Sequence, residues 1–380
     1  MSNKHTNKIY KKWRDGIKKQ KIDKPVGIIW YHDRLRSPSR TDFYKYLKAN
    51  NDTNKIHWEI VTDTGEGEDI EKVMKVRGLD RVDLCIDGLG AYLGSYVSRE
   101  YIMKHEIPVA RTMPDVEVHK GEFGPAHHKF NSEVPVSFLI LFWNKECTGP
   151  TERLRKYTED LPAQEDAVFE HIMYGVDTTK YKGLEKKDID VMAVYLAEAQ
   201  NPWQKNRMRM NKVSDKYMNW WNNNVNAAHE ISHLPPEGLN SEQKWILDKF
   251  KGQQMYSAFI DIEFYKYASW ANRSKICLAD TSSRDYMVMK YLEFGASGAM
   301  VMGEKPMGND DLFNAQTMCV IDMERIEVDL PQQIEYYIKN ETGAVEREKK
   351  ALKVRQIIED NYTLEHWRQR WENCCMKYVE

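Results

Sequence analysis

Short apolar runs alternate with helical stretches along most of this chain, and this alternation constrains the fold more than any other feature. In the first half the apolar runs are "VGIIWY" (26–31), "IHWEIVT" (56–62), "VDLCID" (82–87), "IPVART" (107–112), "VPVSFLILFW" (134–143) and "AVFEHIM" (167–173). Helical segments of about ten residues lie between them, which is the pattern of βαβ units. Because such units build a parallel sheet with helices on both faces, we predict an α/β fold.

The alternation restarts after a polar, turn-rich stretch, "YGVDTTKYKGLEKKD" (174–188), which we take as a domain boundary. A charged, aromatic and helical region (203–250) follows the first strand of the second set. The predicted strands of this half are 189–197, 256–262, 275–280, 298–302 and 319–323, and the predicted helical runs near its end are 330–360 and 363–378.

The last predicted helix carries Trp367 and Trp371 four residues apart, on one helical face. A helix with such an aromatic face must dock on a partner surface, and we expect it to cross back to the first domain. A chain of 380 residues is too long for one ordinary core, which favours two domains. The predicted division is a basic N-terminal extension (1–24), a first domain (25–174), a second domain (175–360) and a crossing helix (361–380).

The charge balance argues against a chain that binds polyanions with its whole surface, since 56 Lys and Arg face 58 Asp and Glu. The first 24 residues are nevertheless rich in lysine. Two interpretations stay open for them: a solvated helical extension, or a surface for an anionic partner such as DNA or a membrane.

The chain shows no sign of a membrane or secreted protein. No apolar run approaches the roughly 20 residues that span a bilayer, and no apolar core follows the basic N-terminus as in a signal peptide. The six cysteines form no C-x-x-C pair, so we expect free thiols, no zinc site and a cytoplasmic location.

One strand–helix–strand stretch, "SSRDYMVMKYLEFGASGAMVMGE" (282–304), carries more chemistry than its fold needs. Ser282 and Asp285 form a capping-box pattern, so we predict a helix from Ser282 to about Phe294, with Gly295 and Gly298 free to take positive φ at its end. Glu293 is not explained in this way, because acids are disfavoured near a helix C-terminus.

A carboxylate in that place can accept hydrogen bonds from the hydroxyls of a ribose. The helix N-terminus, at the carboxyl end of a parallel strand, is a site for phosphate. One strand–helix unit can thus hold a nucleotide. The alternative is that Glu293 is a simple surface glutamate.

The longer run "YASWANRSKICLADTSSRDYMVMKYLEFGASGAMVMGE" resembles the nucleotide-sugar half of GT-B glycosyltransferases, those of family 4 and of the spore-maturation type. Asn272, Lys290, Glu293, Ala296 and Gly298 match positions of that motif. "YGVDTTKY" and "KKDIDVMAVY" resemble the interdomain segment of the same proteins. The resemblance covers residues 165–378, and the first domain by pattern only.

The resemblance implies two Rossmann-like domains that face each other across a cleft. It implies transfer of a sugar from a nucleotide-diphosphate sugar, UDP- or GDP-linked, to an acceptor hydroxyl. It also implies a retaining reaction without a metal or another cofactor. In that family Glu293 would bind the ribose, and Asp285 would contact the donor sugar.

The family usually has glutamate at the position of Asp285, followed by glycines, where this chain has Tyr286 and Met287. This departure leaves the donor sugar and the role of Asp285 open. The other residues that we assign to the donor site are Lys205, Arg207, Ser282, Ser283, Arg284, Lys290 and Gly298. Of these, Lys205 and Arg207 would offset the charge of the leaving diphosphate.

In the first domain, the loop "TMPDVEVHKGEFGPAHH" follows a predicted strand. Related enzymes carry an Asp–His pair there, so we assign catalytic roles to Asp115 and His119, the histidine as a base or a partner of the sugar. A metal site from His119, His127 and His128 has no further ligand spacing to support it. Arg34, Arg36 and Arg40, in the loop after the first strand, are assigned to an anionic acceptor.

The acceptor itself stays open between a glycan, a lipid, a protein and a hydroxymethylated DNA base. Phage DNA glucosyltransferases share this fold, so modified DNA is the second candidate. A sugar-nucleotide 2-epimerase shares the architecture but needs no acceptor surface. The remaining alternative is a non-catalytic relative that binds nucleotide sugars or nucleic acid, which the missing glycines after Asp285 keep open.

Overall fold

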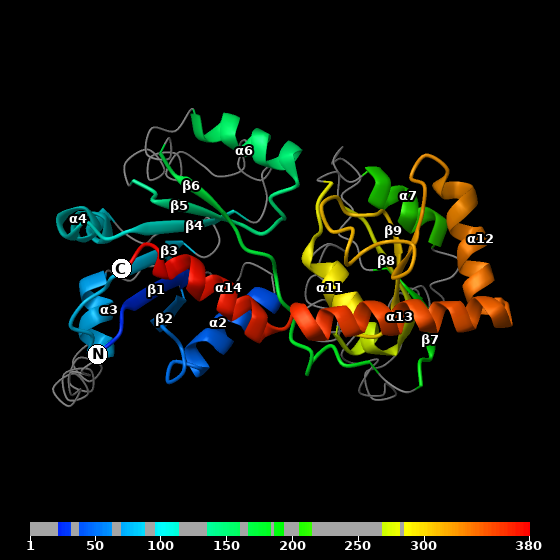
Figure 1. Cartoon of the computed structure of the whole chain (residues 1–380), viewed down its shortest axis with the longest axis horizontal. Coiled ribbons are helices and arrows are strands. Elements are labelled where there is room, and N and C mark those ends of the chain that lie inside the picture. Colours follow the sequence, from blue (N-terminus) through cyan, green and yellow to red (C-terminus); the bar gives the residue numbers. More distant parts are fainter. Residues whose placement is uncertain are drawn as a thin grey trace, which may run out of the picture. The chain divides into compact units, whose positions relative to one another are not determined.

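The computed structural model describes residues 22–31, 38–62, 70–87, 96–113, 135–159, 166–183, 186–193, 205–214, 268–281 and 285–380. The chain divides into two compact units (Figure 1). Unit 1 contains Met1–Asn144, Thr148–Met173 and Trp367–Glu380, and unit 2 contains Lys145–Cys147 and Tyr174–His366. Both units are α/β, as the alternation of apolar and helical segments predicts.

Unit 1 contains a six-stranded parallel sheet with the order β2-β1-β3-β4-β5-β6. Each strand overlaps an apolar run predicted from the sequence. The strands are β1 (Val26–Tyr31), β2 (His57–Thr62), β3 (Leu84–Asp87), β4 (Val109–Met113), β5 (Phe138–Leu141) and β6 (Val168–His171). The helices are α2 (Pro38–Ala49), α3 (Ile70–Arg77), α4 (Tyr96–His105) and α6 (Thr148–Glu159).

Helices cover both faces of this sheet, which is why β1 is buried along its whole length. On one face, Val26 and Ile28 of β1 belong to a core cluster that also contains Val73 of α3 and Ile102 of α4. The opposite face receives α2 and the end of the chain (Figure 1).

The last helix, α14 (Leu364–Met376), belongs to unit 1 from Trp367 onward. Trp367 stacks on Phe43 of α2 with ring centroids 3.8 Å apart. Trp371 meets Trp58 of β2 edge to face, with centroids 6.4 Å apart. Both tryptophans are fully buried. The aromatic face predicted for this helix therefore packs against the first domain, as expected.

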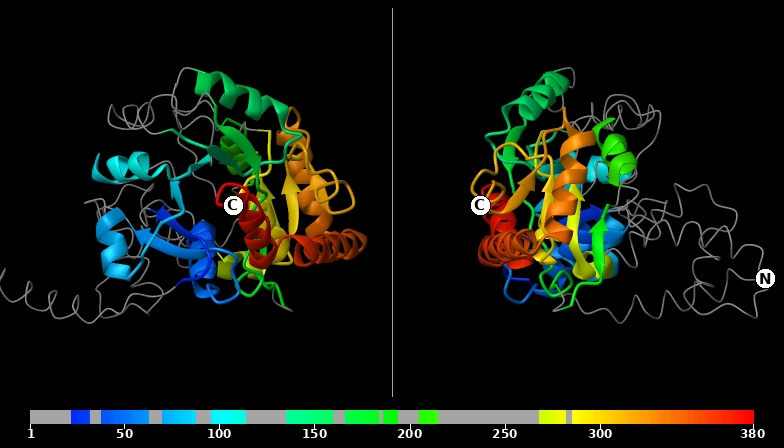
Figure 2. Two further views of the ribbon diagram at one scale, coloured as in Figure 1. Left: turned by 60° about the vertical axis from the view of Figure 1, so that its left-hand side comes forward. Right: turned by 90° about the vertical axis from the view of Figure 1, so that its right-hand side faces the viewer.

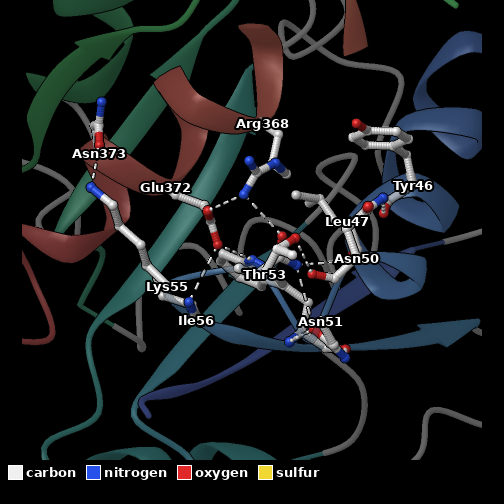
Figure 3. Close-up of polar contacts among 12 residues, drawn as sticks. Tyr46, Leu47, Asn50, Asn51, Thr53, Lys55, Ile56, Arg368, Glu372 and Asn373 are labelled. Atoms are coloured by element: carbon white, nitrogen blue, oxygen red, sulfur yellow. Dashed lines mark hydrogen bonds and ion pairs between the residues drawn. The ribbon is translucent and has the colours of Figure 1, made fainter. Parts of the chain in front are cut away.

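Polar contacts complete the docking of α14 (Figure 3). The Glu372 carboxylate is buried and accepts hydrogen bonds from the Ile56 backbone N–H at 3.3 Å and from Arg368 Nη1 at 2.9 Å. Lys55 donates to Asn373 at 2.8 Å. Because a buried carboxylate is costly without partners, these bonds make the site specific for this helix.

Unit 2 contains a four-stranded parallel sheet with the order β10-β9-β8-β7 in its described part. The strands are β7 (Ile189–Met192), β8 (Ser274–Ala279), β9 (Met300–Gly303) and β10 (Met318–Val320). The helices are α7 (Lys205–Ser214), α11 (Met289–Ala296), α12 (Ile326–Lys339) and α13 (Glu341–Asn361). The strand predicted at 256–262 and most of the region 203–250 lie outside the described residues.

One expectation for the end of unit 2 is wrong: the helical run predicted at 330–360 is two helices. Asn340 is extended between them, and its side-chain oxygen accepts a hydrogen bond from the Gly343 N–H at 3.1 Å, which caps α13. Helix α12 can then lie beside α7, as both views show (Figures 1 and 2). Met210 of α7 and Leu330 of α12 share a core cluster with the sheet.

Two further sequence expectations concern covalent state and membranes. All six cysteines are free and buried, as predicted. Within the described ranges, no helix has the length and apolar character that a bilayer span requires.

Candidate functional site

The segment that leads into α11 differs from the prediction. The helix begins at Met289, with Val288 as the N-cap, and not at Ser282. Asp285 has φ +65°, which is left-handed backbone, so the predicted capping box is wrong. Its carbonyl accepts a 2.6 Å hydrogen bond from the Met307 N–H, and Tyr286 forms a β-bridge with Met307. Pairing with this distant segment replaces the first helical turn. Ser282, Ser283 and Arg284 lie outside the described residues.

The C-terminal end of α11 also differs in part from the prediction. Gly298 has φ +70°, as predicted for the residue that ends the helix. Gly295, however, lies within α11. A Cβ at that position would be 2.5 Å from Ile358 Cδ1, so glycine there allows close packing against α13.

A pocket of about 280 Å³ lies where β8 and β9 end, at the carboxyl edge of the sheet. In open α/β sheets this edge is where ligands bind. Three of the lining residues are acidic and one is basic. The pocket is lined by Thr281, Asp285, Glu304, Lys305, Pro306, Met307, Gly308 and Asp310.

Glu304 connects the ends of the two strands. Its Oε2 accepts hydrogen bonds from the Thr281 N–H at 3.0 Å and from the Thr281 hydroxyl at 2.7 Å. Its carbonyl accepts a 2.6 Å bond from the Tyr291 hydroxyl of α11. The residue before it, Gly303, has φ +144°, and a Cβ there would be 2.0 Å from the Ala279 carbonyl oxygen. Glycine is therefore required for this crossing of backbones.

Glu304 and Lys305 were missed by the sequence reasoning. The signal was present, since both follow a buried strand directly, and the carboxyl ends of parallel strands meet at one edge. Lys305 forms an ion pair with Asp310, so both ends of the charged loop are held.

Glu293, the predicted ribose ligand, is only 5% exposed, and its neighbours Leu292 and Phe294 are fully buried. This excludes the simple surface glutamate. Burial of an ionised carboxylate is favourable only with polar or charged partners, so the position is specialised. Lys290, on the same helix, is half-buried. Neither Glu293 nor Lys290 is among the described lining residues of the pocket at the carboxyl edge.

Asn272 of the predicted motif has a structural role, and so does Arg209 of α7, which is not part of that motif. The Asn272 amide joins β8 to the segment before β7, because it accepts from the Gly183 N–H at 3.1 Å and donates to the Lys180 carbonyl at 2.8 Å. Arg209 binds both oxygens of Glu327 on α12, at 2.8 and 2.7 Å. Lys205 and Arg207 lie on α7, but their side chains are not in the part of the chain that the structure describes.

In unit 1 the structure places one of the predicted acceptor residues. Arg40 is not in an open loop, but in the first turn of α2, 7% exposed and 5.0 Å from the ring centroid of Phe142. The cause is that α2 begins at Pro38. Arg34, Arg36, Asp115, His119, His127 and His128 lie outside the described residues.

The sequence reasoning also missed a buried ion pair in unit 1. Asp87 ends β3 and pairs in register with Arg111 of the adjacent strand β4, and Arg111 Nε lies 3.1 Å from Asp87 Oδ2. Thr112 donates a hydrogen bond to the Asp87 carbonyl at 3.1 Å. Within the described part of the chain, no three His, Cys, Asp or Glu side chains gather as metal ligands would.

Comparison with known families matches residues 244–373 to the family described as glycosyl transferase-like. This segment contains β8, α11, β9, β10, α12 and α13, and therefore the pocket at the carboxyl edge. No curated protein matches the sequence.

Solved glycosyltransferases share the fold over nearly the whole chain. Anabaena HepE, in complex with UDP and glucose, has a TM-score of 0.55 at 10% identity, over 93% of this chain and 100% of that one. Sucrose-phosphate synthase from Thermosynechococcus elongatus has a TM-score of 0.52 at 9% identity, over 93% and 98%. A glycosyltransferase from Rickettsia africae has a TM-score of 0.50 at 9% identity, over 94% and 100%.

At such low identities the solved structures establish the fold alone, two Rossmann-like domains. The chain therefore has the fold of GT-B glycosyltransferases, and its residues 244–373 are similar to the glycosyl transferase-like family.

Proposed function

We propose that this enzyme transfers a sugar from a UDP-sugar to an acceptor hydroxyl and holds the donor at the carboxyl edge of β8 and β9. The pocket formed there by Thr281, Asp285, Glu304 and Lys305 is the observation that carries the proposal. It lies within the segment that matches the glycosyl transferase-like family. HepE, which shares the fold, was solved with UDP and glucose, which supports UDP over GDP as the nucleotide.

The charge of this pocket indicates which part of the donor it takes. Carboxylates are hydrogen-bond acceptors only, and sugar hydroxyls are donors. A pocket with three acids and one lysine therefore suits the hydroxyls of the transferred sugar better than the diphosphate. In this proposal Asp285, which is exposed, contacts the sugar, and Glu304 positions the Thr281 segment.

The diphosphate needs positive charge from elsewhere in the enzyme. We assign this role to Lys205, Arg207 and Lys290, with the segment Ser282–Arg284 before α11. Glu293 then binds the ribose hydroxyls from within α11. Gly298, which ends that helix, keeps α11 in place rather than touching the donor.

In the reaction, the bond between the anomeric carbon and the diphosphate oxygen breaks and UDP leaves. A bond from the anomeric carbon to the acceptor oxygen forms, and the acceptor proton passes to the leaving phosphate. Retention of the anomeric configuration and independence of metal are part of the proposal. So are Asp115 and His119 as a pair on the acceptor side.

A binding screen tests the donor assignment. UDP-, GDP-, ADP- and TDP-sugars are added to the protein in thermal-shift measurements, with Glu293→Gln as the site variant and Glu335→Gln, an exposed glutamate of α12, as the control. A donor at 100 times its Kd stabilises by about 2.7 kcal/mol. We expect a UDP-sugar to stabilise wild type and the control but not Glu293→Gln. Stabilisation by none of the four, or equal stabilisation of all three proteins, would contradict the proposed site.

A second experiment separates the enzyme from a binding protein and one acceptor class from another. Release of UDP from the stabilising donor, without acceptor, is expected from the enzyme and not from a non-catalytic relative. The lysine-rich residues 1–24 favour an anionic acceptor, so hydroxymethylated DNA is the second candidate. Its binding would weaken steeply with salt, because phosphate contacts release counterions.

A further inference from the structure

A second cavity of unit 2, of about 530 Å³, lies at the amino end of the strands. Its lining residues precede β7, begin β8, precede β9 or lie on α13: Lys182, Gly183, Lys186, Lys187, Lys275, Gly298, Arg347, Glu348, Ala351, Leu352 and Arg355. It is thus at the opposite edge of the sheet from the pocket assigned to the donor. Its volume falls within the range of about 300–1,000 Å³ that is typical of small-molecule sites.

The lining is strongly basic. It contains six cationic side chains and a single acid, Glu348. Some of this charge is offset: Lys275 pairs with Asp190 at 2.6 Å, Arg355 with Glu359 at 2.8 Å, and Arg347 with Glu348 at 3.4 Å. Among the described residues, Lys182, Lys186 and Lys187 form no ion pair with a carboxylate, although Lys186 is near enough to Asp188 to contribute to the lowered pKa of that carboxyl.

The cations come together through the fold and not through the sequence. Lys187 Nζ donates to the carbonyls of Asn272 and Ser297, both at 3.0 Å, and so joins the starts of β8 and β9. Arg347 Nη1 donates to the Tyr337 carbonyl at 2.7 Å. Arg355 donates to the Lys182 carbonyl. Lys187, Arg347 and Arg355 are therefore held in place, while Lys182 and Lys186 are exposed at the rim.

We propose that this cavity binds a small polyanion that carries two or more phosphate groups, at a site separate from the donor pocket. Fixed guanidinium groups match phosphate oxygens with paired hydrogen bonds, and flexible lysines at a rim add charge to such a ligand. A single phosphate would offset only part of the excess charge. The site adds a binding function to the enzyme and does not depend on which nucleotide sugar is the donor.

Calorimetry on the full-length protein at constant ionic strength tests this site, with inorganic tripolyphosphate as the probe and inorganic phosphate as the comparison. The site variant is the double substitution Lys182→Ala and Lys186→Ala. The matched control removes two exposed lysines outside the cavity, by Lys339→Ala and Lys349→Ala. We expect tripolyphosphate to bind wild type with a stoichiometry of one and more tightly than phosphate does. The site variant is expected to weaken binding by about tenfold or more, and the control by less than about twofold.

Repeating the titration with saturating UDP distinguishes the two edges of the sheet. Unchanged tripolyphosphate binding supports a separate site, whereas displacement by UDP would place the probe in the donor pocket and overturn the proposal. No binding to wild type, or an equal loss in both double variants, would overturn it as well. Comparison of ATP with tripolyphosphate in the same assay then shows whether a nucleoside is part of the ligand. Circular dichroism of both double variants verifies their fold.

Discussion

The two ends of the sheet in unit 2 carry opposite charge. At the carboxyl end, Asp285, Glu304 and Asp310 surround a single lysine, Lys305. At the amino end, six cations surround a single glutamate, Glu348. The strands between the two ends are apolar and buried. The strands therefore act as a scaffold, and the short segments beyond their ends set the charge of each edge.

Part of this asymmetry follows from helix dipoles. In a parallel α/β unit the helices run against the strands, so helix N-termini lie at the carboxyl edge and helix C-termini at the amino edge. Acids are favoured near the former and cations near the latter. Lys187, which donates to the carbonyl of Ser297, the C-cap of α11, is such a cation. Helix dipoles alone, however, do not explain a cluster of six cations. Lys182 and Lys186 are exposed, so solvent screens their interaction with a helix C-terminus.

The largest effect is expected from glycines at the two ends of β9. Gly303→Ala, at the carboxyl end, places a Cβ 2.0 Å from a carbonyl oxygen. We expect a loss of about 3 kcal/mol or more in the free energy of unfolding. Gly298→Ala, at the amino end, has its nearest contact at 3.8 Å, so only the φ of +70° is costly, about 1–2 kcal/mol. Urea denaturation measures both; equal losses would contradict the geometry described for the carboxyl end.

Glu304→Gln is expected to act on the donor and not on the polyanion. The variant weakens the charge-assisted hydrogen bonds from Thr281, which are worth about 1.5–3 kcal/mol for a charged acceptor. Donor binding should fall by roughly 10- to 150-fold if the whole of this energy is lost. Calorimetry with the UDP-sugar and with tripolyphosphate on the same variant provides the measurement. A change in tripolyphosphate affinity alone would reverse our assignment of the two edges.

Glu348→Gln is the matched substitution at the amino edge. It removes the one acid of the cavity, which lies 3.4 Å from Arg347 and is largely exposed. Tripolyphosphate should therefore bind more tightly, by about 0.5–1 kcal/mol, the scale of an exposed charge pair. Weaker binding in this variant would argue against an electrostatic site, whereas donor binding is expected to stay unchanged.

The smallest effect is a pH dependence of stability at the amino edge. Burial lowers the pKa of Lys187 to about 8 from its ordinary value of 10.5; the Cys277 thiol opposes this shift, and Arg355 and Arg347 add to it. The unfolded chain then binds more protons than the folded chain between these two values, so stability rises with pH across this window. Because Lys187 is only half-buried, screening should keep the effect below about 1 kcal/mol.

Lys187→Met removes this titrating group, and the comparison of the two proteins isolates its contribution. Unfolding by urea is measured for wild type and variant at several pH values between about 8 and 10.5. The stability of wild type relative to the variant should rise with pH. A difference that stays constant or falls would show that the Lys187 ammonium is not destabilised by its surroundings.

The sequence by itself was sufficient for the architecture. Apolar runs such as 26–31 and the helical segments predicted between such runs are local patterns, and they coincide with strands such as β1 and helices such as α4. The spacing of Trp367 and Trp371 likewise predicts a buried face, since residues four apart share one side of a helix. The motif around Glu293 predicts a nucleotide-sugar segment in the second half of the chain, and the match to the glycosyl transferase-like family falls in the same region.

Contacts between segments that are far apart in the sequence could not be predicted from these local patterns. Asp285 fits a capping box in sequence, yet it pairs with Met307, because a β-bridge to a distant segment outweighs a local preference. Glu304 and Thr281 meet because β8 and β9 are neighbours in register. Lys182, Lys275 and Arg355 likewise line one cavity because the fold brings together segments that are far apart in the sequence. Periodicity reports on which face a side chain occupies within its own element, whereas a site depends on the order and register of strands that lie far apart along the chain.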